Sequence, residues 1–447
     1  MPLTMPQPLV YVLVINWNGL EHLEDCFRSL IETTYPDARF LLIDNASSDG
    51  SVTFVREHFG SDARVEVIEC ARNLGWSGGN NVGLQRAIDD GADYVFLLNN
   101  DTATARDAIA ELVAMAEARP ETGALAPKML LFDQPFLLNS LGLECSIIAS
   151  SWDRGLGRTD GPQWDTPRQV IGVCGGAWFV RVAALRKTGL LPEDFEIYLD
   201  DLDLCLRLWD AGYEAWTCPT ARVRHKFSAT YGHGERARRK YYLSTRNRFR
   251  IMLRNFPWPR LIAHAPAVLV GEGRAVGRAL LDDEPWRAGM HVRAWLDALA
   301  YLPHALVARA RRRKAGLDSG RFWPLVRRRP LFCPRVCLPE RGWYEEVAIQ
   351  GRRVRPMSAR AWANTPGGRL RVFHVNCYPA LGPTEVVLHA DGVELACLST
   401  MNADAAVVEA PPGTIEFEAR RLFPAEETGE AVDVGGWIGM EGLEARG

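Results

Sequence analysis

The sequence predicts an α/β domain with an open, mainly parallel sheet, followed by a helical segment and a β-sandwich. Three observations predict this order. Strands and helices alternate over about the first hundred residues, and residues 261–313 show a helical pattern rich in Ala, Leu and Arg. Beyond Pro339, short alternating runs are separated by Gly and Pro turns. We therefore expect three segments, at 1–255, 256–335 and 336–447.

Composition and charge are those of a soluble protein with two or three cores. The chain has 447 residues, and its formal net charge of -3 argues against a general nucleic-acid binder. Ten Cys residues occur without Cys-x-x-Cys pairs, so neither a disulfide framework nor a structural zinc site is indicated. No secretory signal precedes the first strand, and no apolar run reaches the roughly 18 residues of a spanning helix. We expect a cytoplasmic protein.

Four apolar strands begin the α/β domain. The first is continuously apolar and β-branched, as expected of a parallel strand that is covered on both faces. The predicted strands are 9–15, 39–43, 65–69 and 94–98. Apolar residues at helical spacing predict helices between them, at 20–34, at 51–58 and up to about residue 89. Residues 133–170 show little periodicity, and we expect loops and short strands there.

Each of the four strands ends in polar residues. The clusters are Asn16-Trp-Asn-Gly19, Asp44-Asn-Ala-Ser-Ser-Asp-Gly50, Arg72 to Asn81 with Gly78-Gly79, and Asn99-Asn100-Asp101. Turn chemistry explains any one of them, but their repetition indicates one polar cleft at the carboxyl edge of the sheet. A P-loop pattern is absent, and no Gly-x-Gly-x-x-Gly follows the first strand, which weakens a dinucleotide-binding interpretation.

Three carboxylates open a second candidate region. Asp200, Asp201 and Asp203 begin an apolar helical run that ends at Gly212. The positive end of the helix dipole favours ionised acids, and an ionised carboxylate there can act as a general base. A well-capped amphipathic helix is the alternative. Arg207 lies four residues after Asp203 and can pair with it, so we interpret Asp203 as structural.

Two features flank these acids. Gly175-Gly176, in the run 170–181, would let the backbone approach a ligand closely, although a bulged strand explains the pair equally well. His225 ends a short strand at 221–224. A lone His is more often a surface or core residue than a ligand.

The order of these motifs resembles the family-2 glycosyltransferases of the A-type fold, and most closely their bacterial rhamnosyltransferase-like branch. The resemblance covers roughly residues 9–250. It implies a Rossmann-like nucleotide-diphospho-sugar transferase domain. It also implies transfer of a sugar, with rhamnose as one candidate, from a dTDP- or UDP-sugar to a hydroxyl of a glycan or lipid-linked acceptor in bacterial surface polysaccharide synthesis.

The resemblance further implies a divalent cation, Mg²⁺ or Mn²⁺. In the family, an Asp-x-Asp element holds the cation on the nucleotide diphosphate, whereas this chain has Asn99-Asn100-Asp101. Asp101 would then be the direct ligand, with Asn99 as a weak or water-mediated one. By the same resemblance, His225 would complete the metal site.

The remaining positions follow from the same resemblance. Asp44 would contact the base or ribose, and Arg72 would flank the nucleotide. The other donor-binding candidates are Trp17 and Asn18 over the base, Asn100, and Gly176 and Trp178 beside the donor sugar, with Trp178 as a platform for the sugar.

Asp201 is the candidate catalytic base, and Asp200 replaces the Glu of the family's Glu-Asp pair on the acceptor side. A single base without a separate nucleophile implies single displacement, hence inversion. Two other functions stay open. A sugar nucleotidyltransferase would require Arg and Lys after the first strand, where Asn16-Trp-Asn-Gly19 has none. A non-catalytic glycan-binding or scaffold protein would tolerate the loss of acids from the Asp-x-Asp element.

The rest of the chain has accessory roles in this interpretation. The basic runs 309–314 and 327–329 are either solvated charge or a contact with the inner face of a membrane. Residues 240–249 match the family's Tyr-Tyr-x-x-Arg-Asn-Arg ending, and they either face a ligand or form an ordinary amphipathic helix. For the β-sandwich, glycan binding and homo-oligomer formation both stay open.

Overall fold

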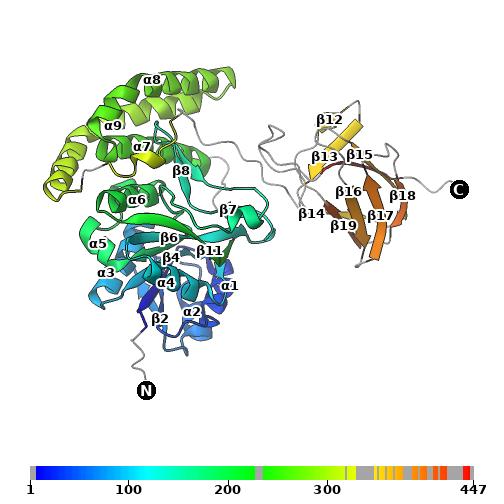
Figure 1. Ribbon diagram of the computed structural model, residues 1–447, viewed down its shortest axis with the longest axis horizontal. Helices are drawn as coiled ribbons and strands as arrows, with labels where there is room; N and C mark the ends of the chain where they lie inside the picture. Colours follow the sequence, from blue (N-terminus) through cyan, green and yellow to red (C-terminus); the bar gives the residue numbers. More distant parts are fainter. Residues whose placement is uncertain are drawn as a thin grey trace. The chain divides into compact units, whose positions relative to one another are not determined.

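The computed structural model describes residues 7–226, 235–317 and 320–328, and the strands between 347 and 442. The chain divides into two compact units. The first comprises Met1–Asp133, Asn139–Gly155 and Pro162–Cys333, and the second comprises Gln134–Leu138, Leu156–Gly161 and Pro334–Gly447. Three long helices belong to the first unit: α7 (Glu235–Asn255), α8 (Trp258–Leu281) and α9 (Pro285–Lys314) (Figure 1).

The first unit is built on a mixed nine-stranded sheet with the order β3-β2-β1-β4-β10-β6-β11-β5, and the ninth strand, β7, pairs with β6 beside this path (Figure 1). Its first half contains the four predicted strands, all parallel: β1 (Val10–Asn16), β2 (Ala38–Asp44), β3 (Val65–Glu69) and β4 (Tyr94–Asn99). The prediction of an open α/β sheet is confirmed. The carboxyl ends of these strands share one edge, where sheets of this kind bind ligands.

The second half of the sheet returns distant residues to that edge. Its strands are β5 (Thr102–Thr104), β6 (Thr122–Leu131), β10 (Ala177–Arg181) and β11 (Glu214–His225). β10 runs antiparallel to β4 and β6, and β11 lies parallel to β6. β11 also pairs with β5, and this register places His225 opposite Thr102, directly after the Asn99-Asn100-Asp101 motif. Along the chain, β6 is followed by three short strands before β10, as expected for this region: β7 (Leu138–Ser140), β8 (Leu143–Cys145) and β9 (Ser151–Asp153).

Six helices of the first unit precede α7. They are α1 (Leu20–Ile31), α2 (Ser51–Phe59), α3 (Gly75–Asp89), α4 (Ala108–Ala118), α5 (Val182–Thr188) and α6 (Asp200–Asp210). None of the described helices has the length and apolar character needed to cross a membrane. Because α3 begins at Gly75, Gly78 and Gly79 lie inside a helix, and the predicted polar loop through Asn81 was wrong. A Cβ on Gly79 would lie 2.6 Å from Cδ1 of Ile15, so the glycine lets α3 pack closely on the sheet.

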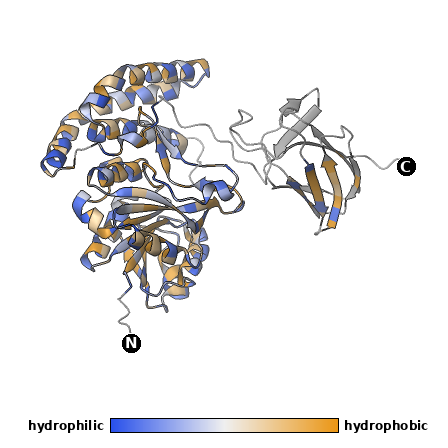
Figure 2. Ribbon diagram, in the orientation of Figure 1, coloured by the Kyte–Doolittle hydropathy of each residue, from blue (hydrophilic) through white to orange (hydrophobic). Residues whose placement is uncertain are grey.

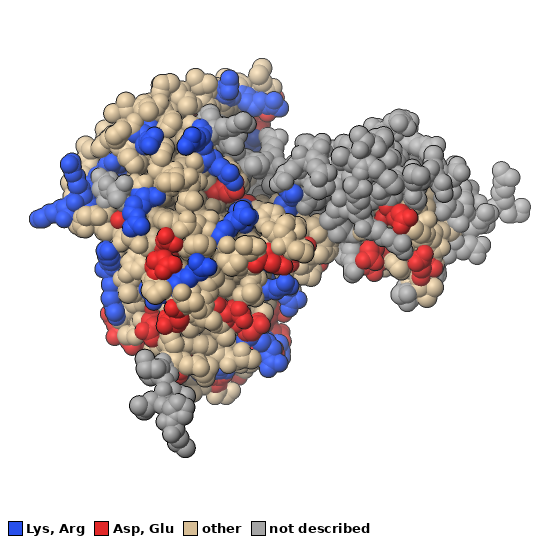
Figure 3. Space-filling model, in the orientation of Figure 1, with Lys and Arg blue, Asp and Glu red and all other residues tan. Residues whose placement is uncertain are grey.

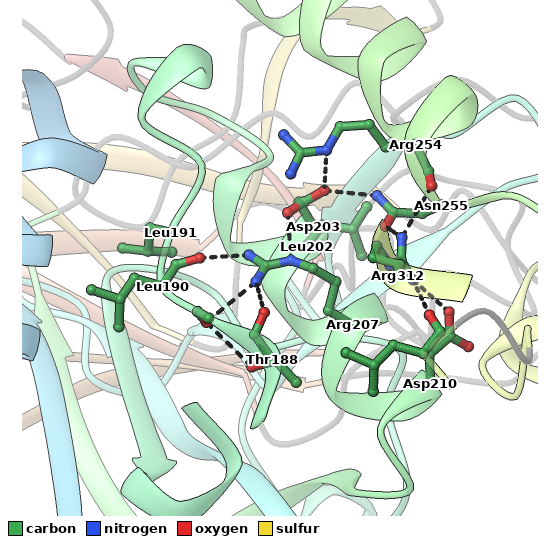
Figure 4. Close-up of polar contacts among 12 residues, drawn as sticks. Thr188, Leu190, Leu191, Leu202, Asp203, Arg207, Asp210, Arg254, Asn255 and Arg312 are labelled. Atoms are coloured by element: carbon green, nitrogen blue, oxygen red, sulfur yellow. Dashed lines mark hydrogen bonds and ion pairs between the residues drawn. The ribbon is translucent and has the colours of Figure 1, made fainter. Parts of the chain in front are cut away.

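Buried ion pairs fix α6 in the first unit (Figure 4). The Nε of Arg207 donates to Asp203 at 2.9 Å, its Nη2 donates to the carbonyl of Leu190 at 2.8 Å, and the side chain of Asn255 donates to Asp203 at 2.7 Å. Burial alone would raise the pKa of Asp203, but the charges of Arg254 and Arg207 and the bond from Asn255 lower it to about 2. The structural role predicted for Asp203 is confirmed.

A strained turn, residues 195–199, leads into α6. Three of its residues, Glu196, Tyr198 and Leu199, have φ angles of 66°, 71° and 65°, in the left-handed region that non-glycine residues rarely adopt. Asn247 of α7 is fully buried, and its Nδ2 lies 2.9 to 3.0 Å from three carbonyl oxygens of this turn. Asn247 therefore determines how the chain enters the helix that begins at Asp200.

The second unit is a β-sandwich. One sheet has the order β12-β13-β20-β15-β18 and the other β14-β19-β16-β17. The strands are β12 (Val347–Ile349), β13 (Arg352–Met357), β14 (Arg360–Thr365), β15 (Gly368–Val375), β16 (Glu385–Ala390), β17 (Val393–Ser399), β18 (Ala406–Ala410), β19 (Gly413–Ala419) and β20 (Gly436–Gly442). Val372, Val408, Leu388 and Phe417 share one core although they come from both sheets, which confirms the predicted architecture.

The replacement Asn247→Ala removes a hydrogen-bond donor from the carbonyl oxygens of Ile197 and Tyr198, while that of Phe195 keeps a bond from Arg246 at 3.0 Å. We expect the free energy of unfolding to fall by about 2–4 kcal/mol, because buried acceptors lose their partner. Chemical denaturation measures this, with Arg239→Ala as the control, since its ion pair with Glu196 is largely exposed and should contribute less than about 1 kcal/mol. Equal stability of Asn247→Ala and the wild type would show that the turn does not depend on α7.

Candidate active site

A cleft of about 1510 Å³ opens where β1 to β4 end. Its walls include residues from all four polar clusters, so the expectation that the clusters share one cleft is confirmed. The predicted site residues among its lining are Trp17, Arg72, Asn99, Asn100 and Asp101. Asp201 and His225 do not line this cleft themselves. Asp201 lies beside Gly175 and His225 beside Gly176, and these two glycines lie next to Trp76 and Asn99, which line the cleft.

Asp101 and His225 form a buried pair. Oδ1 of Asp101 lies 3.1 Å from Nε2 of His225, and the other ring nitrogen, Nδ1, lies 2.7 Å from the side-chain oxygen of Asn139. Because Asn139 accepts at Nδ1, the ring presents Nε2 to the carboxylate. Burial alone would raise the pKa of Asp101, but the hydrogen bond with His225 and the charge of that ring lower it.

The first turn of α6 presents two carboxylates in different surroundings. Ser77 donates its hydroxyl to Asp200 at 2.6 Å, while Asp201 accepts from the backbone N–H of Gly175 at 2.9 Å and of Leu202 at 2.7 Å. Burial, followed by the charge of Asp200, raises the pKa of Asp201 to about 7, and burial also raises the pKa of Asp200. We expected the helix N-terminus to favour the ionised forms, but burial outweighs it here.

Gly175 and Gly176 lie beside both the Asp101–His225 pair and the carboxylate of Asp201. A Cβ on Gly176 would lie 3.3 Å from Cε1 of His225, and a Cβ on Gly175 would lie 2.9 Å from the ring of Trp76 and 3.5 Å from Oδ2 of Asp201. The two glycines precede β10 and are not a bulge within a strand. The backbone therefore passes close to both His225 and the carboxylate of Asp201, and a side chain on Gly175 or Gly176 would displace Trp76 or Met129, each 2.9 Å from the added Cβ.

Sequence reasoning did not single out Trp76. Its indole Nε1 donates to the side-chain oxygen of Asn99 at 3.1 Å, and the ring lines the cleft beside Gly175. The oxygen that Asn99 would offer to a cation is thus already in use. Other residues missed were Ser77, Asn139, Arg239 and Lys240. Ser77 and Lys240 lie within the marked stretches 72–81 and 240–249 but were not singled out, whereas Asn139 and Arg239 belong to no motif and reach the site through tertiary packing.

The prediction that Trp178 is a sugar platform was wrong. Its side chain is fully buried in the hydrophobic core on β10, so its ring has no exposed face on which a sugar could stack. Asp44 is also buried. Its carboxylate accepts from Asn16 at 3.2 Å and from the backbone of Ser47 at 2.9 Å, and it therefore holds the loop that follows β2.

The other predicted donor-binding residues border the cleft more openly. Trp17 is 55% exposed, and Arg72 is exposed as well. Asn18, with φ 50°, accepts from the backbone of Ser48 at 2.8 Å, which joins the loops after β1 and β2. Asn100 donates to the side-chain oxygen of Asn16 at 2.6 Å. Trp17, Asn18 and Arg72 are therefore the exposed side chains of this set.

Asp101 and His225 fit one side of a divalent cation site. A carboxylate oxygen and an imidazole nitrogen are both common metal ligands, and here they lie within reach of a single ion. Within the described part of the chain, no three His, Cys, Asp or Glu side chains converge as metal ligands. The remaining ligands would have to come from water or from the diphosphate of a bound nucleotide, as is usual for Mg²⁺.

The comparisons with known proteins agree with this geometry. Residues 11–189 match the profile of Glycosyl transferase family 2. N-acetylglucosaminyl-diphospho-decaprenol L-rhamnosyltransferase of Mycobacterium tuberculosis is 26% identical over 234 residues, which cover 48% of this chain and 75% of that protein. An uncharacterised protein of Sinorhizobium fredii is 26% identical over 239 residues, and there the match covers 51% of this chain but only 25% of the relative.

Among solved structures, GalNAc-T7 with UDP, GalNAc and Mn²⁺ superposes with a TM-score of 0.50 at 14% identity, over 82% of this chain and 65% of that one. This likeness concerns the fold alone. The sheet and the cleft agree with the match of residues 11–189 to Glycosyl transferase family 2, and the α/β domain has the A-type glycosyltransferase fold.

Proposed function

We propose that this protein is an inverting, metal-dependent glycosyltransferase. It moves a sugar, with rhamnose as the first candidate, from a dTDP- or UDP-sugar to a hydroxyl of a glycan or lipid-linked acceptor. One observation carries the proposal: at Gly175–Gly176 a carboxylate with a pKa near 7 adjoins a buried Asp–His pair at the end of a large cleft. The name of the mycobacterial relative, which includes both a diphospho-decaprenol and L-rhamnose, supports this donor and acceptor class.

In this proposal the acceptor oxygen attacks the anomeric carbon, the bond from that carbon to the diphosphate oxygen breaks, and Asp201 takes the hydroxyl proton. A base works best when its pKa is close to the working pH, and burial gives Asp201 such a value. The backbone N–H groups of Gly175 and Leu202 donate to the two carboxylate oxygens of Asp201, so the carboxylate keeps its orientation when it takes up the proton.

The diphosphate would lie in the cleft, where Arg72, Arg239 and Lys240 supply positive charge. Asp101, His225 and, weakly, Asn99 would hold Mg²⁺ or Mn²⁺, and a cation bound there stabilises the charge on the departing diphosphate. Asn139 positions His225 for this role.

Two other functions are less well supported. A glycan-binding scaffold would need neither a partly buried carboxylate with a raised pKa nor an Asp–His pair beside it. A sugar nucleotidyltransferase would need cationic side chains in the loop after β1, where residues 16–19 carry none. A cytoplasmic location stays part of the proposal.

The replacement Asp201→Asn removes the base and keeps the shape of the side chain. We expect the rate of sugar transfer to fall by about 10²–10⁴-fold while UDP or dTDP binding with Mn²⁺ stays close to that of the wild type. Asp89→Asn is the matched control, because Asp89 also lines the cleft but lies outside the proposed chemistry. Transfer at the wild-type rate by Asp201→Asn would refute the assignment of the base.

The pH dependence of activity and stability should be opposite in sign. Transfer needs ionised Asp201, so kcat should rise through about pH 7.

Stability should show the opposite trend. Folding raises the pKa of Asp201 from 3.8 to about 7, so protonation of Asp201 favours the folded state over the unfolded state. This contribution to stability is therefore complete below pH 3.8 and lost as the pH rises through about 7. Thermal midpoints measured without a cation should show this loss, and Asp201→Asn should reduce it. If the thermal midpoint of Asp201→Asn fell with rising pH as steeply as that of the wild type, the raised pKa would not belong to Asp201.

Replacing Asn139 tests the cation site without touching a ligand. Asn139→Ala should weaken Mn²⁺ binding by about 10- to 100-fold, because His225 loses the partner that orients its ring. Calorimetric titration of Mn²⁺ in the presence of UDP measures the affinity directly. Asn73→Ala, at another cleft-lining asparagine, is the control and should bind Mn²⁺ as the wild type does. Unchanged affinity in both variants would mean that His225 holds no cation.

A further inference from the structure

The helices α8 and α9 expose apolar residues along their outer faces. The exposed positions recur at helical spacing and define what we call the α8–α9 surface: Ile262, Leu269 and Leu280 on α8, and Val292, Leu296 and Leu299 on α9. Figure 2 shows apolar residues recurring along both helices. Helices of soluble domains normally bury such a stripe, and no described element of the first unit covers this one.

The opposite faces of these helices are tightly held. Glu272 of α8 is buried, pairs with Arg248 of α7 and lies 2.7 Å from Nδ1 of His291 on α9. On α9, the hydroxyl of Tyr301 donates to Asp194 at 2.7 Å. The apolar side chains therefore point outward because the polar and aromatic face of each helix is already packed, and they do so in a fixed orientation.

The charge along the α8–α9 surface is mainly positive, and Asp282, Asp283 and Glu284 form an acidic turn at the end where the two helices join. Both helices are described in full, and their acidic residues are Glu272, which is buried, and Asp297, whose carboxylate accepts from Tyr242. The exposed basic residues include Arg274, Arg278, Arg293, Arg311, Arg313 and Lys314. In Figure 3 the outer side of α8 is largely uncharged, with Lys and Arg at its borders.

The structure corrects the role expected for the basic run 309–314. Arg309 and Arg312 are buried: Arg309 donates to the carbonyl of Phe256 at 2.8 Å, and Arg312 donates to Asp210 at 2.6 Å. Only the exposed half of the run is available to a partner. In the second run, 327–329, Arg329 lies outside the described residues.

We propose that the α8–α9 surface docks on an anionic lipid bilayer. A helix that lies in the interface plane inserts Leu, Ile and Val side chains at the boundary of the acyl chains, while Arg and Lys at its margins attract anionic head groups. A protein partner would also bury the apolar stripe, but it would not require a margin that is mainly basic along both helices. This charge complementarity favours lipid as the occupant.

The helix α7 connects this surface to the cleft. Arg239, Lys240 and Leu243 of α7 line the cleft, whereas Tyr241 and Arg248 of the same helix contact α9 and α8. The bilayer would thus lie about one helix layer, roughly 10 Å, from the cleft, which suits an acceptor that carries a lipid. This last step rests on the proposed function, whereas lipid docking itself does not.

Co-sedimentation of the full chain with vesicles tests the proposal. Vesicles of equimolar phosphatidylcholine and phosphatidylglycerol should bind the protein, and vesicles of phosphatidylcholine alone should bind it more weakly. Leu296→Glu should weaken partitioning by at least about tenfold. Val393→Glu in the second unit is the matched control, because the two side chains are 62% and 64% exposed, and it should bind as the wild type does.

Two outcomes overturn the proposal: no sedimentation with the anionic vesicles, or equal sedimentation of Leu296→Glu and the wild type. If the wild type is a dimer, Leu296→Glu is a monomer and neither binds vesicles, the surface instead takes a second copy of the chain. Thermal midpoints confirm that both variants fold. UDP binding, measured on the same samples, keeps a failure of the glycosyltransferase proposal separate from a failure of lipid docking.

Discussion

The candidate site depends on one close approach of the backbone to two side chains. Gly175 donates its N–H to Asp201, and a side chain on Gly176 would press against His225. Asp201 opens a helix, whereas His225 ends a strand of the sheet, and this pair of glycines lies beside both. The proposed base and the proposed cation ligand His225 therefore adjoin the same Gly-Gly segment.

Packing far from the cleft supports that approach. The turn before α6 carries left-handed residues, and Asn247 satisfies its carbonyl groups from inside α7. Asp203, with its arginine partners, fixes the next turn of the same helix. Such buried polar networks are costly unless every member is satisfied. Here they hold two further carboxylates, Asp200 and Asp201, in surroundings where burial keeps them from ionising readily.

The part of the fold with strong periodicity was predictable from sequence. The four parallel strands, the helix that begins at Asp200 and the pair of Asp203 with Arg207 follow from spacing alone. The polar strand ends marked the cleft, because parallel strands bring their carboxyl ends together. The position of His225 beside Asp101 was expected only from the family resemblance. Its physical cause is the register between β11 and β5, which local sequence does not encode.

The errors have definite physical causes. Trp178 lies on a strand that is buried on both faces, so period-two alternation gives no sign of which side chains reach the cleft. Gly78 and Gly79 resembled a turn, whereas they allow a helix to lie against the sheet. The pKa of Asp201 depends on burial by segments that are distant in sequence. Arg309 and Arg312 point inward for a similar reason. Their hydrogen-bond acceptors, Phe256 after α7 and Asp210 on α6, are distant from the basic run in sequence.

The central claim is that a cation bound at Asp101 and His225 lies next to the carboxylate of Asp201. Crystals grown with UDP and Mn²⁺ test it most directly, because the anomalous signal of manganese locates the ion without reference to the rest of the map. The account predicts a peak within coordination distance of Asp101 and His225, on the side of Gly176. A peak held by other residues, with neither Asp101 nor His225 within coordination distance, would contradict it.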